Sequence, residues 1–199
     1  MKVVVIGATG TIGTAVVAEL GGRHEIVKVA RTRGDHQVDI KDIGSIKALF
    51  GRLGKVDAIV CAAGGGHFGP LADTTAEQFA GGLKDKLMGQ VNLVLAGQAH
   101  LKDGGSFTLT SGILSTEPIR NGANLSTVNA AIDAFARAAA IELPRGLRIN
   151  VVSPTLLTES AGALGEYFRG FEFAPAKRVA LAYSRSVEGG QTGQVFKVW

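Results

Sequence analysis

Three glycines near the start of the chain are spaced so that a phosphate group could approach the backbone. Gly7, Gly10 and Gly13 separate an apolar run over residues 1–6 from a helix-like stretch over residues 14–20. The first glycine permits a sharp exit from a strand, the second leaves room for a pyrophosphate, and the third lets the helix pack closely on the sheet. The free N–H groups of that helix would face the phosphates. The alternative is a glycine-rich turn that binds nothing, because glycine is abundant at 28 of 199 residues.

Strands and helices alternate along the chain, which predicts a parallel sheet covered by helices on both faces. Strands are expected at residues 1–6, 25–30, 57–63, 105–111, 147–153 and 192–199. Helices are expected at residues 14–20, 42–53, from about 75, 83–101 and 126–143, with an interrupted helical segment over 155–182. The predicted fold class is α/β, a Rossmann-like, doubly wound and mostly parallel seven-stranded sheet. No linker or repeat divides the chain, so residues 1–199 are expected to form a single domain.

The composition is that of an ordinary globular protein. Apolar residues make up 46% and charged residues 19%, and no apolar run approaches the ~20 residues of a membrane span. We therefore expect a cytoplasmic protein with no membrane partner. The net charge is +4 without a long basic run, which suits a small anionic ligand better than nucleic acid. The lone cysteine, Cys61, is interpreted as a small buried residue at a strand end, with a reactive thiol as the alternative.

Nearly the whole chain resembles the short-chain dehydrogenase/reductase family. Besides the glycine turn, the resemblance rests on residues 39–42, 61–64 (Cys-Ala-Ala-Gly, where the family has Asn-Asn-Ala-Gly), 109–111, 129–135 and 148–154. It implies that the protein binds NAD or NADP. It also implies reduction of carbonyls or oxidation of alcohols, which the family performs with an Asn-Ser-Tyr-Lys set.

The catalytic set departs from the family pattern. Leu125 takes the position of the tyrosine and Asn129 that of the lysine. Gly112 takes that of the serine, with Ser111 one residue early. Lys86 takes the position of the asparagine, so the lysine and asparagine are exchanged, as in the ketoreductase domains of polyketide synthases. In the family the tyrosine hydroxyl gives a proton to the substrate oxygen. Leu125 has no proton to give, so the resemblance implies a non-standard active site.

Other side chains could supply the missing proton donor. Lys86 could polarise a carbonyl or hold a carboxylate, or it could swing into solvent. Ser111 could reach inward after a backbone shift, or its hydroxyl could bond to the backbone at the strand end. Tyr167 lies in the interrupted helical segment over 155–182, which in the family usually covers the substrate, so it could enter the site from above or pack against the phenylalanines of that segment. His67 and Ser126 are further alternatives. The expected catalytic residues are Lys86, Ser111, Asn129 and Tyr167.

The expected cofactor is NADP rather than NAD. Family members that prefer NAD carry an acidic residue at the end of the second strand, where this chain has Ala30, followed by Arg31 and Arg33. Arginine binds phosphate through two parallel charged hydrogen bonds, which suits a 2′-phosphate. The alternative is that one or both arginines face water. Further cofactor contacts are expected from Thr9, Thr11, Ile12, Asp39, Ile40, Cys61, Ala62, Ala63, Gly64, Pro154 and Thr158, and no metal site is expected.

Two functions fit these features. The first is an NADP-dependent oxidoreductase for a small carbonyl or alcohol substrate, and the second is a non-catalytic NADP-binding sensor or assembly partner. The apolar and aromatic character of residues 156–173 favours the enzyme, because such a segment can cover a small hydrophobic substrate. Alanines spread around the helix expected at 126–143 predict close approach of another helix, and hence a homodimer or homotetramer.

Overall fold

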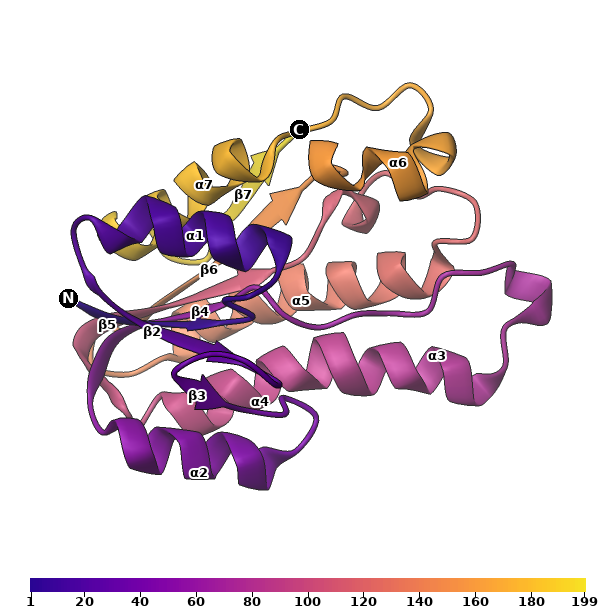
Figure 1. Ribbon diagram of the computed structural model, residues 1–199. Helices are drawn as coiled ribbons and strands as arrows, with labels where there is room; N and C mark the ends of the chain where they lie inside the picture. Colours follow the sequence, from indigo (N-terminus) through magenta and orange to yellow (C-terminus); the bar gives the residue numbers. More distant parts are fainter.

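Seven strands form the sheet of the computed structural model, which describes residues 1–199, in the order β3-β2-β1-β4-β5-β6-β7 (Figure 1). The strands are β1 (Lys2–Ile6), β2 (Glu25–Ala30), β3 (His36–Gln37), β4 (Val56–Cys61), β5 (Leu101–Thr110), β6 (Arg148–Pro154) and β7 (Val195–Val198). Every neighbouring pair is parallel. The predicted fold class is confirmed, with a sheet that is wholly rather than mostly parallel. The strand order reverses between β1 and β4, where open α/β sheets bind ligands.

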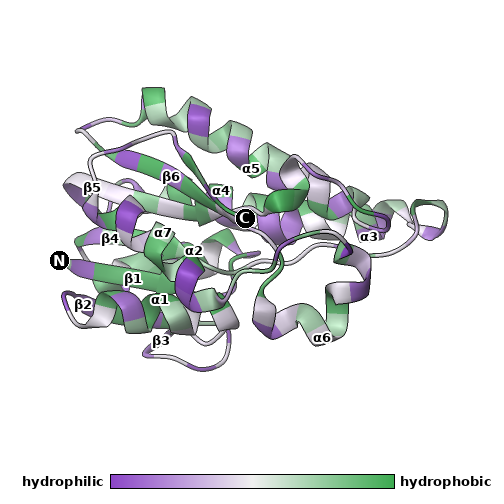
Figure 2. Ribbon diagram, turned by 90° about the horizontal axis from the view of Figure 1, so that it is seen from above, coloured by the Kyte–Doolittle hydropathy of each residue, from purple (hydrophilic) through white to green (hydrophobic).

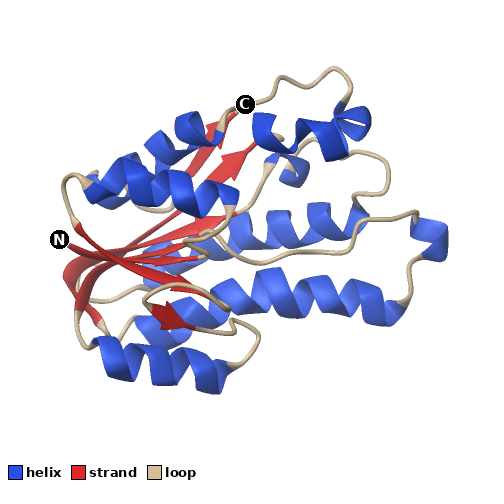
Figure 3. Cartoon of the chain, viewed as in Figure 1, coloured by secondary structure: helices blue, strands red, loops and turns tan.

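Two layers of helices cover the sheet (Figure 3). α1 (Thr11–Gly21) and α7 (Ala176–Glu188) lie on one face, and α2 (Ile43–Leu53), α4 (Met88–Gly97) and α5 (Ala123–Glu142) lie on the other. Alternate residues of β1 enter the two cores. Val3 and Val5 pack toward α1 and α7, whereas Val4 and Ile6 pack toward α2, α4 and α5. Burial on both faces explains why β1 is apolar along most of its length (Figure 2).

Some boundaries differ from the sequence prediction. The helix expected at 83–101 stops at Gly97, and Leu101 instead begins β5, where it pairs with Val56 of β4. Gly97 is packed so closely that an added Cβ would lie 2.9 Å from the Ile59 side chain, which places the end of α4 directly on the sheet. The strand expected at 57–63 ends at Cys61. The sequence does not reveal the position of the seventh strand, β3, because its two residues, His36 and Gln37, are too few to show an apolar pattern.

A continuous helical run joins α3 (Ala76–Gly82) to α4 through a π-helical turn over Leu83–Leu87. Thr75 begins this run with a reciprocal cap, in which its hydroxyl accepts from the Gln78 N–H and the Gln78 side chain accepts from the Thr75 N–H. A π turn holds one more residue than an α turn, and such turns are frequent at functional sites. Lys86 lies within it.

The segment predicted as helical but interrupted covers the carboxyl ends of β5 and β6. It contains a 3₁₀ turn over Thr158–Ser160, α6 (Ala161–Leu164) and a second 3₁₀ turn over Gly165–Phe168. α7 begins at Ala176 within the predicted segment and continues to Glu188, beyond the expected end of that segment at residue 182. A small apolar cluster under this segment contains Ile113, Leu114, Leu156 and Phe168. None of the helices has the length and apolar character that a membrane span requires.

Candidate functional site

The glycine turn after β1 lies in direct contact with the backbone at the end of β4 and with the first turn of α1. Gly7 has a positive φ of 85°, and a Cβ there would overlap the Ala62 carbonyl. A Cβ at Gly13 would overlap the Gly7 carbonyl. Gly10 caps α1 without any side-chain hydrogen bond, and the first turn of α1 holds no acidic residue. The first N–H groups of α1 are therefore free, and the turn fits the pyrophosphate of a dinucleotide.

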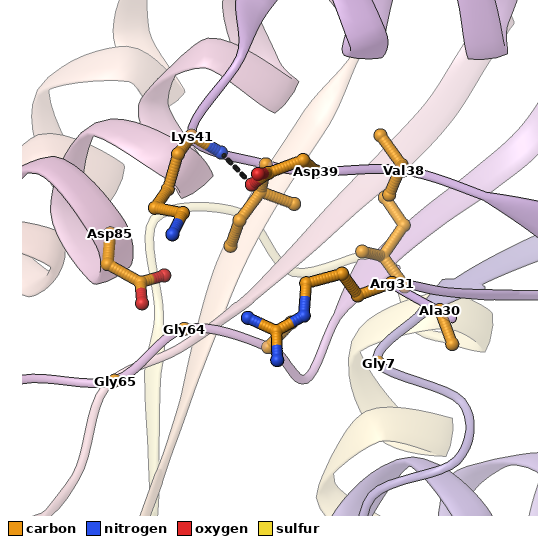
Figure 4. A pocket seen from close by; sticks show the side chains of 12 residues that line it. Gly7, Ala30, Arg31, Val38, Asp39, Lys41, Gly64, Gly65 and Asp85 are labelled. Atoms are coloured by element: carbon orange, nitrogen blue, oxygen red, sulfur yellow. Dashed lines mark hydrogen bonds between the residues drawn. The ribbon is translucent and has the colours of Figure 1, made fainter. Parts of the chain in front are cut away.

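A pocket of about 190 Å³ opens beside this turn, at the carboxyl ends of β1 and β2 (Figure 4). Four charged side chains, those of Arg31, Asp39, Lys41 and Asp85, point toward it. The Asp39 carboxylate accepts from the Lys41 N–H at 3.0 Å, which fixes the turn that presents both side chains. The pocket is lined by Ile6, Gly7, Ala30, Arg31, Val38, Asp39, Ile40, Lys41, Ala63, Gly64, Gly65 and Asp85.

The structure places the expected cofactor residues in three groups. Gly7, Arg31, Asp39, Ile40, Ala63 and Gly64 line this pocket. Thr9 and Gly10 directly precede α1, Thr11, Ile12 and Gly13 begin it, Pro154 ends β6, and Thr158 begins the first 3₁₀ turn after β6. Arg33, Cys61 and Ala62 do not line the pocket. Arg33 is exposed, and the Cys61 thiol is fully buried in the core, which raises its pKa to about 12.

Lys41 and Asp85 are pocket residues that sequence reasoning missed. Lys41 directly follows the Asp39-Ile40 pair, so its position next to two expected contacts was the available signal. Asp85 had no such signal, because its direction depends on the π-helical turn.

Lys86 points into the protein rather than into solvent. Its Nζ donates to the Ser111 carbonyl at 3.0 Å and to Asn129 Oδ1 at 2.7 Å. Loss of water lowers the pKa of Lys86 to about 8, while the negative charge of Asp133 acts in the opposite direction. Asp133 is itself buried one turn beyond Asn129 on α5. Three of the four expected catalytic residues, Lys86, Ser111 and Asn129, therefore meet.

The Ser111 hydroxyl is an unusual buried group. Ser111 is only 3% exposed, and its Oγ has no hydrogen-bond partner in the chain. The interpretation of a strand-end hydroxyl bonded to backbone is wrong. An unpaired buried hydroxyl costs free energy, so it indicates a place for a ligand or water. The apolar side chain of Leu125 packs so closely on Gly66 that a Cβ added to Gly66 would lie 2.8 Å from Leu125 Cδ2.

Tyr167 is not brought to this group. It is 37% exposed and packs edge-on against Phe68, with ring centroids 4.9 Å apart. It therefore contacts the loop after β4 rather than Phe168 or Phe171, which pack on one another. Of the two further alternatives, the His67 ring lies beside Gly69, where an added Cβ would be 2.9 Å from His67 Nε2, and Ser126 Oγ is buried without a partner.

Asn124 is a positioning residue that the sequence did not reveal. Its Oδ1 accepts from the His67 N–H at 2.9 Å and its Nδ2 donates to the Phe79 carbonyl at 2.8 Å. One buried amide thus joins α5 to the loop after β4 and to α3. A Cβ at Gly66 or Gly82 would collide with Asn124 Oδ1, so both glycines belong to the same arrangement. This loop continues from Ala63, Gly64 and Gly65, which line the pocket beside the glycine turn.

Replacing Asn124 with alanine should loosen this loop. We expect the free energy of unfolding to fall by about 1–3 kcal/mol, because the His67 N–H and the Phe79 carbonyl lose a buried partner. Amide hydrogen exchange in residues 64–69 should speed up and NADPH binding should weaken. Thr127→Ala is the matched control, because Thr127 is exposed on the same helix and its hydroxyl donates only to the Ala123 carbonyl one turn earlier. Unchanged exchange in this loop in Asn124→Ala would contradict the assignment.

Comparisons with known proteins agree with this architecture. A family model described as Enoyl-(Acyl carrier protein) reductase matches residues 8–188. Among solved structures, the protein lin1944 from Listeria innocua is 49% identical with a TM-score of 0.98, and all of both chains is covered. A small-chain dehydrogenase in complex with NADPH is 28% identical with a TM-score of 0.89, covering 100% of this chain and 96% of that one.

Two curated relatives are more distant. An uncharacterized oxidoreductase from Methylorubrum extorquens is 27% identical over 143 residues, which cover 69% of this chain. This chain spans only 58% of the length of that relative. Versicolorin reductase 1 from Dothistroma septosporum is 27% identical over 197 residues, covering 85% of this chain and 75% of the reductase. From the family match and the shared fold, the chain belongs to the short-chain dehydrogenase/reductase family of oxidoreductases.

Proposed function

We propose that the protein is an NADP(H)-dependent oxidoreductase for a small carbonyl or alcohol substrate, with Lys86 acting in place of the usual tyrosine. The observation that carries this proposal is the inward-facing Lys86 ammonium. Its hydrogen bonds to Ser111 and Asn129 use two of its three N–H groups and leave one for a ligand. A desolvated charged group of this kind at the carboxyl end of a parallel sheet is typical of a functional site.

Arg31 favours NADP over NAD. It lies at the end of β2 and points toward the pocket beside the glycine turn, and Lys41 adds a second positive charge on the same pocket. A guanidinium group suits a 2′-phosphate, because it can make paired charge-assisted hydrogen bonds. The NADPH complex of the 28% identical small-chain dehydrogenase supports this choice. A bound nicotinamide would supply or accept the hydride.

Lys86 can act as the general acid in reduction and as the general base in oxidation. During reduction its N–H bond breaks and an O–H bond forms on the substrate oxygen, after which the neutral amine regains a proton from water. During oxidation the neutral amine accepts the proton from the alcohol. A pKa of about 8 suits both directions near neutral pH. The apolar cluster around Leu156 and Phe168, with Leu125 at its edge, favours a substrate with a hydrophobic body.

A non-catalytic NADP-binding sensor or assembly partner is the second candidate. Leu125 favours it, because an apolar side chain lies where the family has its proton donor and contacts Gly66. Binding of NADPH without its oxidation by any small aldehyde or ketone would identify this second function.

Three broader features complete the proposal. We propose one domain over residues 1–199, because all strands belong to one sheet. We propose a cytoplasmic location, which the buried free thiol of Cys61 suits. We also propose a homodimer or homotetramer through α5, because Leu95, which lines the groove between α4 and α5, is 56% exposed and Ile141 of α5 is 88% exposed.

Arg31→Ala should weaken NADPH binding about 10- to 100-fold, because a charge-assisted hydrogen bond is worth ~1.5–3 kcal/mol. The affinity for NADH should change little, since NADH has no 2′-phosphate. Arg33→Ala is the matched control, because it removes the same charge two residues away and outside the pocket. Fluorescence titration with each nucleotide measures the four affinities. A larger loss of NADPH affinity in Arg33→Ala than in Arg31→Ala would contradict this prediction, because the 2′-phosphate would then be bound by Arg33.

Lys86→Met should lower the rate of carbonyl reduction by ~10²–10⁴, because it removes the general acid. In the unaltered protein the rate should fall as the pH rises through about 8, since the ammonium then loses its proton. Lys84→Met is the control, because Lys84 is exposed on the same helical turn. NADPH oxidation is followed with a panel of small aldehydes and ketones from pH 6 to 10, and brisk reduction by Lys86→Met would exclude this residue as the donor.

Sedimentation should show particles of two or four times the chain mass of 20.6 kDa. Leu95→Asp should shift them toward a single chain, because it places a charge in the apolar groove between α4 and α5. Leu71→Asp is the control, since Leu71 is also exposed, at 68%, but lies before α3. A single-chain particle for the unaltered protein at micromolar concentration would contradict the assembly.

A further inference from the structure

Trp199, which follows β7, is bound to the elements at both ends of the covering segment, the stretch over residues 156–173. This segment runs from the end of β6 to the start of α7. The Trp199 indole N–H donates to the Ser153 carbonyl of β6 at 3.0 Å. The Trp199 carbonyl accepts from the Arg178 guanidinium, in the first turn of α7, also at 3.0 Å. One residue therefore joins the strand from which the segment leaves to the helix to which it returns.

The Trp199 ring is held at the edge of the small apolar cluster under this segment. The Lys197 ammonium lies over one face of the ring, 4.3 Å from its centroid. The ring also packs against the cluster, whose members from the covering segment are Leu156 and Phe168. A tryptophan suits this position, because its ring is apolar while its N–H needs an acceptor. The ring is thus fixed in direction although it stays partly exposed.

Hydrogen bonds at its base fix where the covering segment begins and ends. The Thr158 N–H donates to the Ala174 carbonyl at 3.0 Å, and the Ala174 N–H donates to the Leu156 carbonyl at 3.1 Å. The Glu159 carboxylate accepts from the Ala176 N–H at 3.0 Å, at the start of α7. These bonds lie at the two ends of the segment, so other contacts must hold its middle on the sheet.

The middle of the segment is held by apolar contacts. Leu164, Phe171 and Phe173 pack against the same cluster as Trp199, and Tyr167 packs on Phe68. Trp199 brings to this packing a ring that is tied to β6, β7 and α7 by two hydrogen bonds and a cation. It therefore supplies a fixed surface at the edge of the sheet for the apolar side chains of the segment.

We propose that Trp199 is a positioning residue that holds the covering segment down on the carboxyl ends of β5 and β6, and so determines how tightly a hydrophobic substrate is bound beneath it. Closure of the segment depends on the chain alone, whereas the effect on a substrate rests on the proposed oxidoreductase function. A closed segment keeps the apolar body of a substrate out of water, which favours its binding. Trp199 does not line the pocket beside the glycine turn, so its loss leaves the nucleotide affinity unchanged.

Hydrogen exchange on the full chain without ligands tests the contact. In Trp199→Ala, the protected amides of residues 156–173 should exchange at least about tenfold faster, because a hydrogen bond and an apolar wall are lost. Trp199→Phe keeps a ring and loses only the N–H, so its effect should be smaller. Leu181→Ala is the control, because Leu181 is exposed on α7 and is not part of the cluster. Unchanged exchange in the segment, or an equal rise in β1 and β4, would overturn the proposal.

Reduction kinetics test the effect on a substrate. With NADPH and aldehydes from propanal to decanal, Trp199→Ala should raise KM at least about tenfold for the longer chains, with kcat changed less than about threefold. Trp199→Phe should recover most of the lost affinity, and NADPH titration should give the same affinity in all variants. A fall in kcat with KM unchanged would contradict a positioning role. If the unaltered protein reduces none of these aldehydes, the oxidoreductase proposal fails, while hydrogen exchange still decides whether Trp199 holds the segment.

Discussion

The site depends on backbone touching backbone at two glycines. No side chain fits at Gly7, because the Ala62 carbonyl occupies that volume, and none fits at Gly13, because the Gly7 carbonyl does. These contacts seat the first turn of α1 directly over the ends of β1 and β4. The strand order reverses there, so no crossover helix fills the edge of the sheet at that point. The same packing that closes the core therefore leaves the N-terminus of α1 open to an anion.

A further glycine connects this turn to the lysine. Gly64 has a positive φ of 107°, and a Cβ on it would lie 2.8 Å from Lys86 Cα, so the loop after β4 rests on the π-helical turn. Gly64 lines the pocket beside the glycine turn on one side of this contact, and Lys86 meets Ser111 and Asn129 on the other. Burying the ammonium costs free energy, which the oxygens of Ser111 and Asn129 offset. The pocket beside the glycine turn and the Lys86 ammonium are therefore separated only by the backbone contact between Gly64 and Lys86.

Much of the fold could be predicted because its signals are local. A strand buried on both faces must be apolar, and the glycine turn needs specific residues at fixed spacing, so β1, α1 and the parallel sheet are readable in the sequence. β3 is not readable, since a pair of residues at the edge of a sheet has no periodicity. The ends of α4 and α7 depend on packing against the sheet, which sequence patterns report poorly.

The residue types of the candidate site could be predicted from the sequence, but the directions in which their side chains point could not. The exchange of lysine and asparagine is visible in the sequence, but the inward direction of Lys86 depends on tertiary packing. Arg31 and Arg33 look equivalent in the sequence, and only the path of the chain after β2 separates them. Asn124 carries no motif, because an amide that joins three elements is recognised only after those elements have been brought together.

The π-helical turn over Leu83–Leu87 has a consequence for how the helical run can vary. It holds an extra residue, and one residue corresponds to about 100° of rotation in an α-helix. The extra residue therefore changes the direction in which the side chains of α4 point relative to those of α3, compared with an uninterrupted α-helix. Leu93 and Val94 are in the core while Lys86 faces Asn129. A related chain with one residue fewer here would have to give up one of these two alignments, which makes the length of this turn as much a part of the site as the lysine within it.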